Sequence, residues 1–133
     1  MFDKAFKAFS ELNVNQKWGQ YLELVQRNYQ HKGLDNPILL SASEWRKGII
    51  SSEELKSASL SFVEAVDSAH DTYVARTKEQ YDQLAADSNL RTFCVLAYKS
   101  SLDDWSPTTN LFFKTQLAGF GSIEHEWLVN KLA

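Results

Sequence analysis

Apolar residues recur at helical spacing from the start of the chain. The first set returns at steps of three and four residues: Phe2, Ala5, Phe6, Phe9 and Leu12. Such spacing places side chains on one face of an α-helix. Asn13 and Gln16 then have the spacing of a helix cap. A second apolar set shares one face of a helical wheel: Val14, Trp18, Tyr21, Leu22, Val25 and Tyr29. The pattern predicts two helices, the second ending at His31-Lys32-Gly33.

A connection and a short helix are predicted next. Pro37 disfavours helical backbone at Asn36, so residues 34–40 are interpreted as a connection. Ser41 and Glu44 have the spacing of a capping box, in which a hydroxyl and a carboxylate satisfy backbone N–H groups. This spacing predicts a short helix from Ser41, with three packing residues: Trp45, Ile49 and Ile50.

The longest periodic stretch covers residues 52–87 and follows a second capping box, Ser51 to Glu54. Five apolar residues share one face of it: Leu55, Phe62, Val66, Tyr73 and Leu84. A straight helix of this length would reach about 54 Å, too long for a small compact domain. Thr77 and Gln80 offer a new cap, so a break is predicted near residues 74–78.

Residues 90–100 are apolar nearly all round, and Ser88-Asn89 offers a cap before them. Phe93 and Val95 also suit a strand, but no second segment alternates with a period of two residues. A lone strand would have no pairing partner, so a helix is favoured. Ser106 followed by Pro107 predicts the start of another helix, Gly119–Gly121 its end, and Ser122 the start of the last. The expected fold is all-α: one compact domain over residues 1–133, with six to eight helices and short loops.

The amino-acid composition indicates a globular protein and excludes several kinds of site. The chain has 133 residues, 44% of them hydrophobic and 23% charged, which is a globular composition. One Cys excludes an internal disulfide and a zinc site built from cysteines. No apolar run approaches the length of a membrane span. We therefore expect a cytoplasmic protein with no membrane partner.

Charge is unevenly distributed along the chain. The net charge is −3, and residues 51–90 hold three basic residues against eight acids. Nucleic-acid binding relies on basic side chains at phosphates, so a nucleic-acid partner is not expected. An acidic segment suits a protein partner with a basic surface. The alternative is that these acids form an ordinary solvated helix surface.

Two groups of residues are the predicted partner contacts. The first is an acidic stripe opposite the apolar face of residues 52–87, with Lys78 among its members: Glu53, Glu64, Asp67, Asp71 and Asp82. The second is a loop with two acids beside an aromatic anchor: Asp103, Asp104 and Trp105. The alternative for Trp105 is a side chain that folds back over the end of its own helix.

Histidines and acids also permit a metal hypothesis. His31, the pair His70-Asp71, and Asp103 or Asp104 follow one another in the order His, His-Asp, Asp. This order resembles the metal-binding pattern of HD-domain phosphohydrolases, which are all-helical, although the apolar–Gly-Lys surroundings of that family's His-Asp pair are absent. The resemblance implies a metal-dependent hydrolase as an alternative function.

Other catalytic patterns are missing from the sequence. Cys94 lies in the most apolar segment and is interpreted as a core residue. Phosphate-binding loops and Gly-x-Ser-x-Gly motifs do not occur. We therefore predict no catalytic residue, no metal and no cofactor. The predicted function is a small acidic protein-binding module, a non-catalytic inhibitor of a basic protein, as in toxin-immunity proteins and phage antagonists. The alternatives are the hydrolase and a helical adaptor or homodimer.

Overall fold

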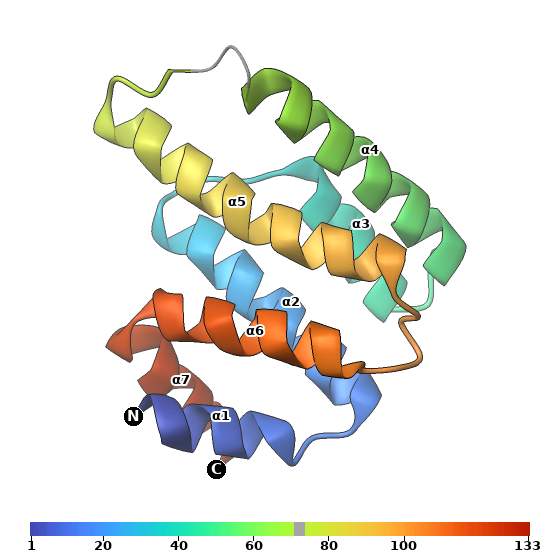
Figure 1. Cartoon of the computed structure of the whole chain (residues 1–133), viewed down its shortest axis with the longest axis vertical. Coiled ribbons are helices and arrows are strands. Elements are labelled where there is room, and N and C mark those ends of the chain that lie inside the picture. Colours follow the sequence, from blue (N-terminus) through green and yellow to red (C-terminus); the bar gives the residue numbers. More distant parts are fainter. Residues whose placement is uncertain (71–73) are drawn as a thin grey trace. The chain divides into compact units, whose positions relative to one another are not determined.

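Seven α-helices and no strand form the regular structure of residues 1–70 and 74–133, which the computed structural model describes apart from the side chain of His70 (Figure 1). The helices are α1 Phe2–Ser10, α2 Val14–His31, α3 Pro37–Arg46, α4 Ser52–His70, α5 Lys78–Lys99, α6 Pro107–Phe120 and α7 Ser122–Leu132. The predicted all-α class with six to eight helices is confirmed.

Contacts divide the chain into two compact units. Unit 1 comprises Met1–Leu24 and Leu102–Ala133, and unit 2 comprises Val25–Ser101. The boundary falls inside α2, so α1, α6, α7 and the first part of α2 belong to unit 1. Both units contain side chains that are fully buried, such as Phe113 in unit 1 and Leu90 in unit 2. The expectation of a single domain stays a prediction.

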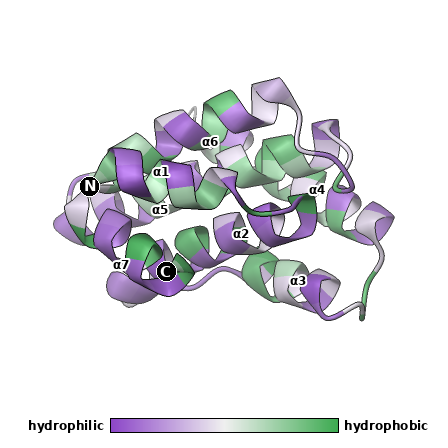
Figure 2. Ribbon diagram, turned by 90° about the horizontal axis from the view of Figure 1, so that it is seen from below, coloured by the Kyte–Doolittle hydropathy of each residue, from purple (hydrophilic) through white to green (hydrophobic). Residues whose placement is uncertain are grey.

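Unit 1 is built around an aromatic cluster. In this unit α1 packs against α7 and α6, and Figure 2 shows apolar and polar residues alternating along α1. The aromatic cluster has five members: Phe9, Trp18, Tyr21, Trp105 and Phe113. The rings of Phe9 and Phe113 stack with their centroids 3.9 Å apart. Such contacts add to the stabilisation from burying the rings.

Unit 2 is built on the pairing of α4 with α5. These helices run side by side in opposite directions, and α3 packs against α4 (Figure 1). The carboxylate of Asp67 on α4 accepts two hydrogen bonds from Arg91 on α5, at 2.7 and 2.9 Å. The hydroxyl of Tyr29, at the end of α2, donates to Asp87 of α5. These polar contacts join α5 to α4 and to the end of α2, one helical turn apart on α5.

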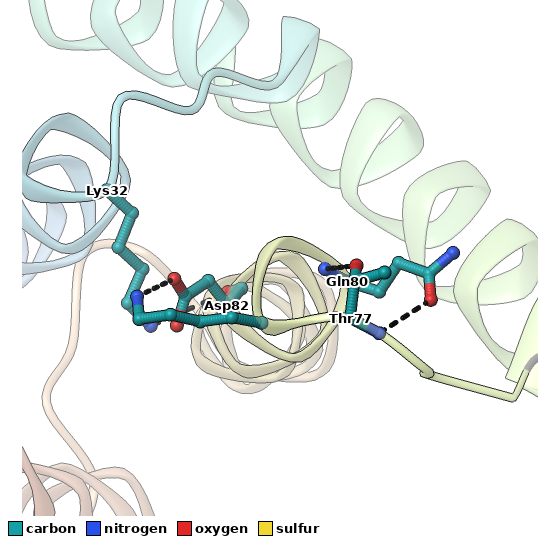
Figure 3. Close-up of polar contacts among 5 residues, drawn as sticks. Lys32, Thr77, Gln80 and Asp82 are labelled. Atoms are coloured by element: carbon teal, nitrogen blue, oxygen red, sulfur yellow. Dashed lines mark hydrogen bonds and ion pairs between the residues drawn. The ribbon is translucent and has the colours of Figure 1, made fainter.

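Four predicted helix starts are confirmed by their hydrogen bonds. Thr77 and Gln80 form a capping box: the N–H of Gln80 donates to the Thr77 hydroxyl and the N–H of Thr77 to the Gln80 side chain, both at 3.1 Å (Figure 3). Two further pairs cap α2 and α4 in the same reciprocal way: Asn13 with Gln16, and Ser51 with Glu54. Ser106 caps α6, with Pro107 in the first turn.

The predicted start of the third helix is wrong. Helix α3 begins at Pro37, and the side chain of Asn36 accepts a hydrogen bond from the N–H of Ile38 at 3.2 Å. A proline disfavours helix at the residue before it, but it favours the first turn of the helix that it opens. Ser41 therefore lies inside the helix. Ile49 lies beyond the end of α3 and is 66% exposed, so it is not a packing residue of that helix.

The predicted break near residues 74–78 is confirmed, whereas the predicted cap at Ser88-Asn89 is wrong. Helix α4 ends at His70, residues 74–76 are not helical, and α5 begins at Lys78. Helix α5 then continues through Ser88-Asn89 to Lys99, so no new helix starts there and residues 90–99 are helical. The hydroxyl of Thr92 donates a hydrogen bond to the backbone carbonyl of Ser88 at 3.2 Å. A residue that can cap a helix does not start a new one when the apolar pattern continues on both sides of it, because the packing of the longer helix keeps the backbone helical there.

Candidate functional site

The predicted acidic stripe lies on two helices instead of one. Glu53, Glu64 and Asp67 are on α4, Asp82 is on α5, and Asp71 lies outside the described residues. A single helical wheel over residues 52–87 therefore does not describe their positions, because the helix ends at His70 and a new one starts at Lys78. The stripe is wrong as a continuous face, while the partner-binding role of its members stays a prediction.

Two members of the stripe are engaged within unit 2. Asp67 binds Arg91 of α5 through both carboxylate oxygens. The carboxylate of Asp82 forms an ion pair with the ammonium group of Lys78, one helical turn earlier, at 2.8 Å (Figure 3). The backbone carbonyl of Asp82 accepts a hydrogen bond from the ammonium group of Lys32 at 3.5 Å. The hydrogen bond from Lys78 holds the pKa of the Asp82 carboxyl below its ordinary value. These two acids offer less to a partner than their sequence positions indicate.

Two acids of the stripe have no ion-pair partner in the part of the chain that the structure describes. Glu53 and Glu64 are exposed on α4, and neither takes part in an ion pair among the described residues. They are eleven residues apart, which is three helical turns, so they share one face. In the loop before α6, the carboxylate of Asp104 accepts the backbone N–H of Trp105 at 2.8 Å. Asp103 is exposed beside it.

Trp105 lies against the aromatic cluster. Its ring centroid is 5.1 Å from that of Trp18 and 5.4 Å from that of Phe9. Its indole N–H donates to the side chain of Asn110 on α6 at 3.0 Å. This is the geometry of the alternative interpretation, a Trp that folds back over the start of α6. A partner contact through its half-exposed edge stays a prediction.

Helix α6 exposes an apolar face that the sequence analysis did not identify. Leu111 is 64% exposed and Phe112 is 51% exposed, although Phe113 and Leu117 on the opposite side are fully buried. The exposed residues of this side define what we call the α6 outer face: Thr108, Leu111, Phe112, Thr115, Ala118 and Gly119. None of them is charged. The exposed Lys114 borders this face, and its ammonium group lies 5.1 Å from the centroid of the Phe6 ring. The signal was present in the run Leu111-Phe112-Phe113, because three consecutive residues cannot all point to one side of a helix.

Comparisons with family models, curated proteins and solved structures find no match. The function is therefore inferred from the geometry of this chain. None of the helices in the described residues has the length and apolarity needed to cross a membrane.

The described part of the chain holds no cluster of three or more potential metal ligands. Within residues 1–70 and 74–133, side chain of His70 excepted, no three His, Cys, Asp or Glu side chains lie close enough together to hold a metal ion. The His70 side chain and Asp71, the central pair of the hypothesis, lie outside that part. His31 belongs to unit 2, and both Asp103 and Asp104 belong to unit 1.

Cys94 is a buried core residue, as predicted. It is fully buried in α5. Burial raises the pKa of the thiol from 9.0 to about 12, against a smaller lowering by the hydroxyl of Ser59. Thiolate is the nucleophilic form of cysteine. The environment of Cys94 therefore opposes nucleophilic chemistry at neutral pH.

We predict that Cys94 stays unreactive in the folded protein. Because the pKa rises from 9.0 to about 12, the folded state holds about 1,000-fold less thiolate than the unfolded chain at neutral pH. Its reaction with dithionitrobenzoate at pH 7.5 should be slow until urea unfolds the protein. As pH rises, the Cys94 thiol loses its proton in the unfolded chain before it does so in the folded protein. The free energy of unfolding therefore falls as pH rises from about 9 towards 12. Rapid labelling under native conditions would contradict the burial of Cys94.

Proposed function

We propose that this chain is a non-catalytic protein-binding module and that the α6 outer face is its contact surface. The observation that carries the proposal is the exposure of Leu111 and Phe112 on a face without charges. A surface helix normally presents charged and polar residues to water. Contiguous exposed apolar side chains mark interaction sites, and interface centres are depleted in charge and enriched in aromatic residues.

We further propose that the partner has a basic surface and is inhibited by the binding of this chain in the cytoplasm. The protein carries a net charge of −3, and Glu53 and Glu64 stand exposed without ion pairs among the described residues. Electrostatic steering acts over about a Debye length and needs no direct contact. The acids then accelerate encounter, while the apolar side chains of α6 hold the complex together.

The proposal is tested by changing the contact face and a matched exposed region separately. The contact variant carries Leu111→Asp and Phe112→Asp. The control carries Leu40→Asp and Ile49→Asp, which replace residues of 65% and 66% exposure in unit 2 with the same added charge. Each tagged protein is incubated with native lysate, and retained proteins are quantified by mass spectrometry. A companion kept by wild type and control but lost by the contact variant is then purified.

Binding kinetics of that purified companion give the quantitative result. The contact variant should bind at least about 100-fold more weakly, mainly through faster dissociation, because two buried anchors would be replaced by desolvated charges. Glu53→Gln with Glu64→Gln should slow association and weaken its salt dependence, with dissociation unchanged. Equal loss in the contact variant and the control, or no companion that discriminates between them, would overturn the α6 assignment.

The same face favours a homodimer as the second candidate. A twofold contact places the same patch of both copies face to face, so a patch without charge brings no like charges together and is suited to self-association. One helix face alone is smaller than the roughly 1,200 Å² that stable interfaces bury, so such a dimer would be weak. Sedimentation velocity of the wild type over a range of concentrations tests this. Self-association that Leu111→Asp with Phe112→Asp abolishes would replace the foreign partner with a second copy.

A further inference from the structure

A groove of about 350 Å³ opens between α4 and α5 in unit 2. Five apolar residues form most of its walls: Phe62, Ala65, Val66, Ala69 and Leu84. Its volume lies within the range of roughly 300–1,000 Å³ that is usual for small-molecule sites. Such sites are mostly apolar, with a few polar groups that orient the ligand.

The apolar walls belong to the face that holds unit 2 together. Leu55, near the start of this face on α4, is fully buried. Phe62, Val66 and Leu84 are only half-buried at the groove. The described residues therefore leave part of the apolar face between the two helices uncovered. An apolar molecule in the groove would remove that surface from water.

One carboxylate stands in the wall of the groove. Oδ1 of Asp87 accepts hydrogen bonds from the hydroxyl of Tyr29 and from Nε2 of Gln83, the latter at 2.9 Å. Burial, together with the hydrogen bond to Asp87, raises the pKa of Tyr29 far above its ordinary value, so the hydroxyl remains a donor. The two bonds fix the carboxylate in place.

The carboxylate of Asp87 lacks a counter-ion. No described Lys, Arg or His forms an ion pair with it, and Oδ2 accepts no hydrogen bond from the described residues. Asp87 is half-buried beside apolar side chains. Acids removed from water are normally paired, and hydrogen bonds from a cation to a carboxylate are among the strongest in proteins.

We propose that this groove binds a small amphiphilic amine: an apolar body against Phe62, Val66 and Leu84, with an ammonium group that donates to Asp87. The charge of Asp87 selects a cation over a neutral molecule or an anion of the same shape. All of these residues lie on α4 and α5 in unit 2, whereas the proposed protein contact is on α6 in unit 1. A negative result for one proposal therefore does not contradict the other.

The test uses three probes that share one apolar body and differ in charge: 4-phenylbutylammonium, 4-phenylbutanol and 4-phenylbutyrate. Each is titrated into the full-length ¹⁵N-labelled protein at neutral pH, and backbone amide shifts are followed by NMR. The amine should shift amides around Val66, Leu84 and Asp87 and bind about 10- to 100-fold more tightly than the alcohol, as a charged hydrogen bond predicts. The carboxylate should bind more weakly than the alcohol.

Two substitutions on α5 separate a specific contact from general charge. Asp87→Asn keeps the oxygen that accepts from Tyr29 and should abolish the preference for the amine over the alcohol. Asp82→Asn removes the same charge from the same helix, outside the groove lining, and should leave the preference intact. Leu84→Ala should weaken binding of the amine and the alcohol alike.

Three results would overturn the proposal. They are equal binding of amine and alcohol to the wild type, equal effects of the two Asp substitutions, and shifts confined to other parts of the chain. If the NMR spectrum of Asp87→Asn shows an unfolded protein, the proposal is tested with the wild type alone, by measuring how salt changes the binding of the amine and of the alcohol. Raising the salt from about 50 to 500 mM should then weaken binding of the amine but not of the alcohol, and an unchanged ratio would contradict the contact with Asp87.

Discussion

Replacing Phe113 with alanine is expected to lower the free energy of unfolding by about 3–5 kcal/mol, the usual loss for a buried phenylalanine. Phe113 is fully buried on α6. Its ring stacks on Phe9 of α1 at 3.9 Å and meets Tyr21 of α2 edge-on at 5.1 Å. Alanine would remove both contacts and leave a cavity among rigid rings, which cannot collapse to fill it. Domains of this size have only about 5–15 kcal/mol of total stability.

Phe112→Ala is the matched control, because it removes the same side chain one residue earlier. Phe112 is 51% exposed, so its loss should change stability by no more than about 0.5 kcal/mol, as for most surface positions. Urea unfolding of both variants, followed by circular dichroism and by Trp fluorescence, gives the comparison. Two of the four tryptophans, Trp18 and Trp105, belong to the aromatic cluster, and the ring centroid of Trp105 is 5.7 Å from that of Phe113. Similar midpoints for the two variants would contradict the described orientation of α6.

Gly121→Ala is expected to destabilise the protein by about 1–3 kcal/mol, the usual strain of a disfavoured backbone conformation. Gly121 joins α6 to α7 with φ of 92° and ψ of 175°. A side chain at Cβ disfavours this region, which is almost restricted to glycine. A Cβ at this position would meet no atom within 4 Å, so the expected cost comes from the backbone alone.

Gly119→Ala, two residues earlier, should have the opposite sign. Gly119 lies within α6, and a Cβ there also meets no atom within 4 Å. Alanine in a helix is favoured over glycine by about 1 kcal/mol, so stability should rise by up to that amount. Melting temperatures of the two variants test the pair. A destabilised Gly119→Ala, or a neutral Gly121→Ala, would show that the turn between α6 and α7 is formed differently.

Local sequence patterns predicted most of the helices because the interactions that start a helix are local. The reciprocal bonds of Thr77 with Gln80 span three residues, as do those of Ser51 with Glu54. The turn at Gly121, with its positive φ, was likewise marked by its glycine. The error at α3 arose within the same local rules, since Asn36 and Pro37 have the pattern of Ser106 and Pro107.

The candidate site was predicted less well, because contacts between residues distant in the sequence decide which acids are paired and where they lie. Asp67 is paired by Arg91, which is 24 residues away. The wheel that placed Asp82 beside Glu53 and Glu64 assumed a helix continuing beyond the break. Asp87 was not singled out in the sequence at all, since its place in an apolar groove depends on how α4 and α5 pack.

The sequence by itself determined the helical class, four of the helix caps and the burial of Cys94, because each follows from neighbouring residues or from local apolarity. It also required that one residue of Leu111-Phe112-Phe113 face away from the core. Only the tertiary structure decided which one: Phe113 meets Phe9 and Tyr21 from other helices, and Leu111 and Phe112 remain in water. Which side of a helix is covered depends on helices distant in the sequence, and that information is not contained in the spacing of one segment.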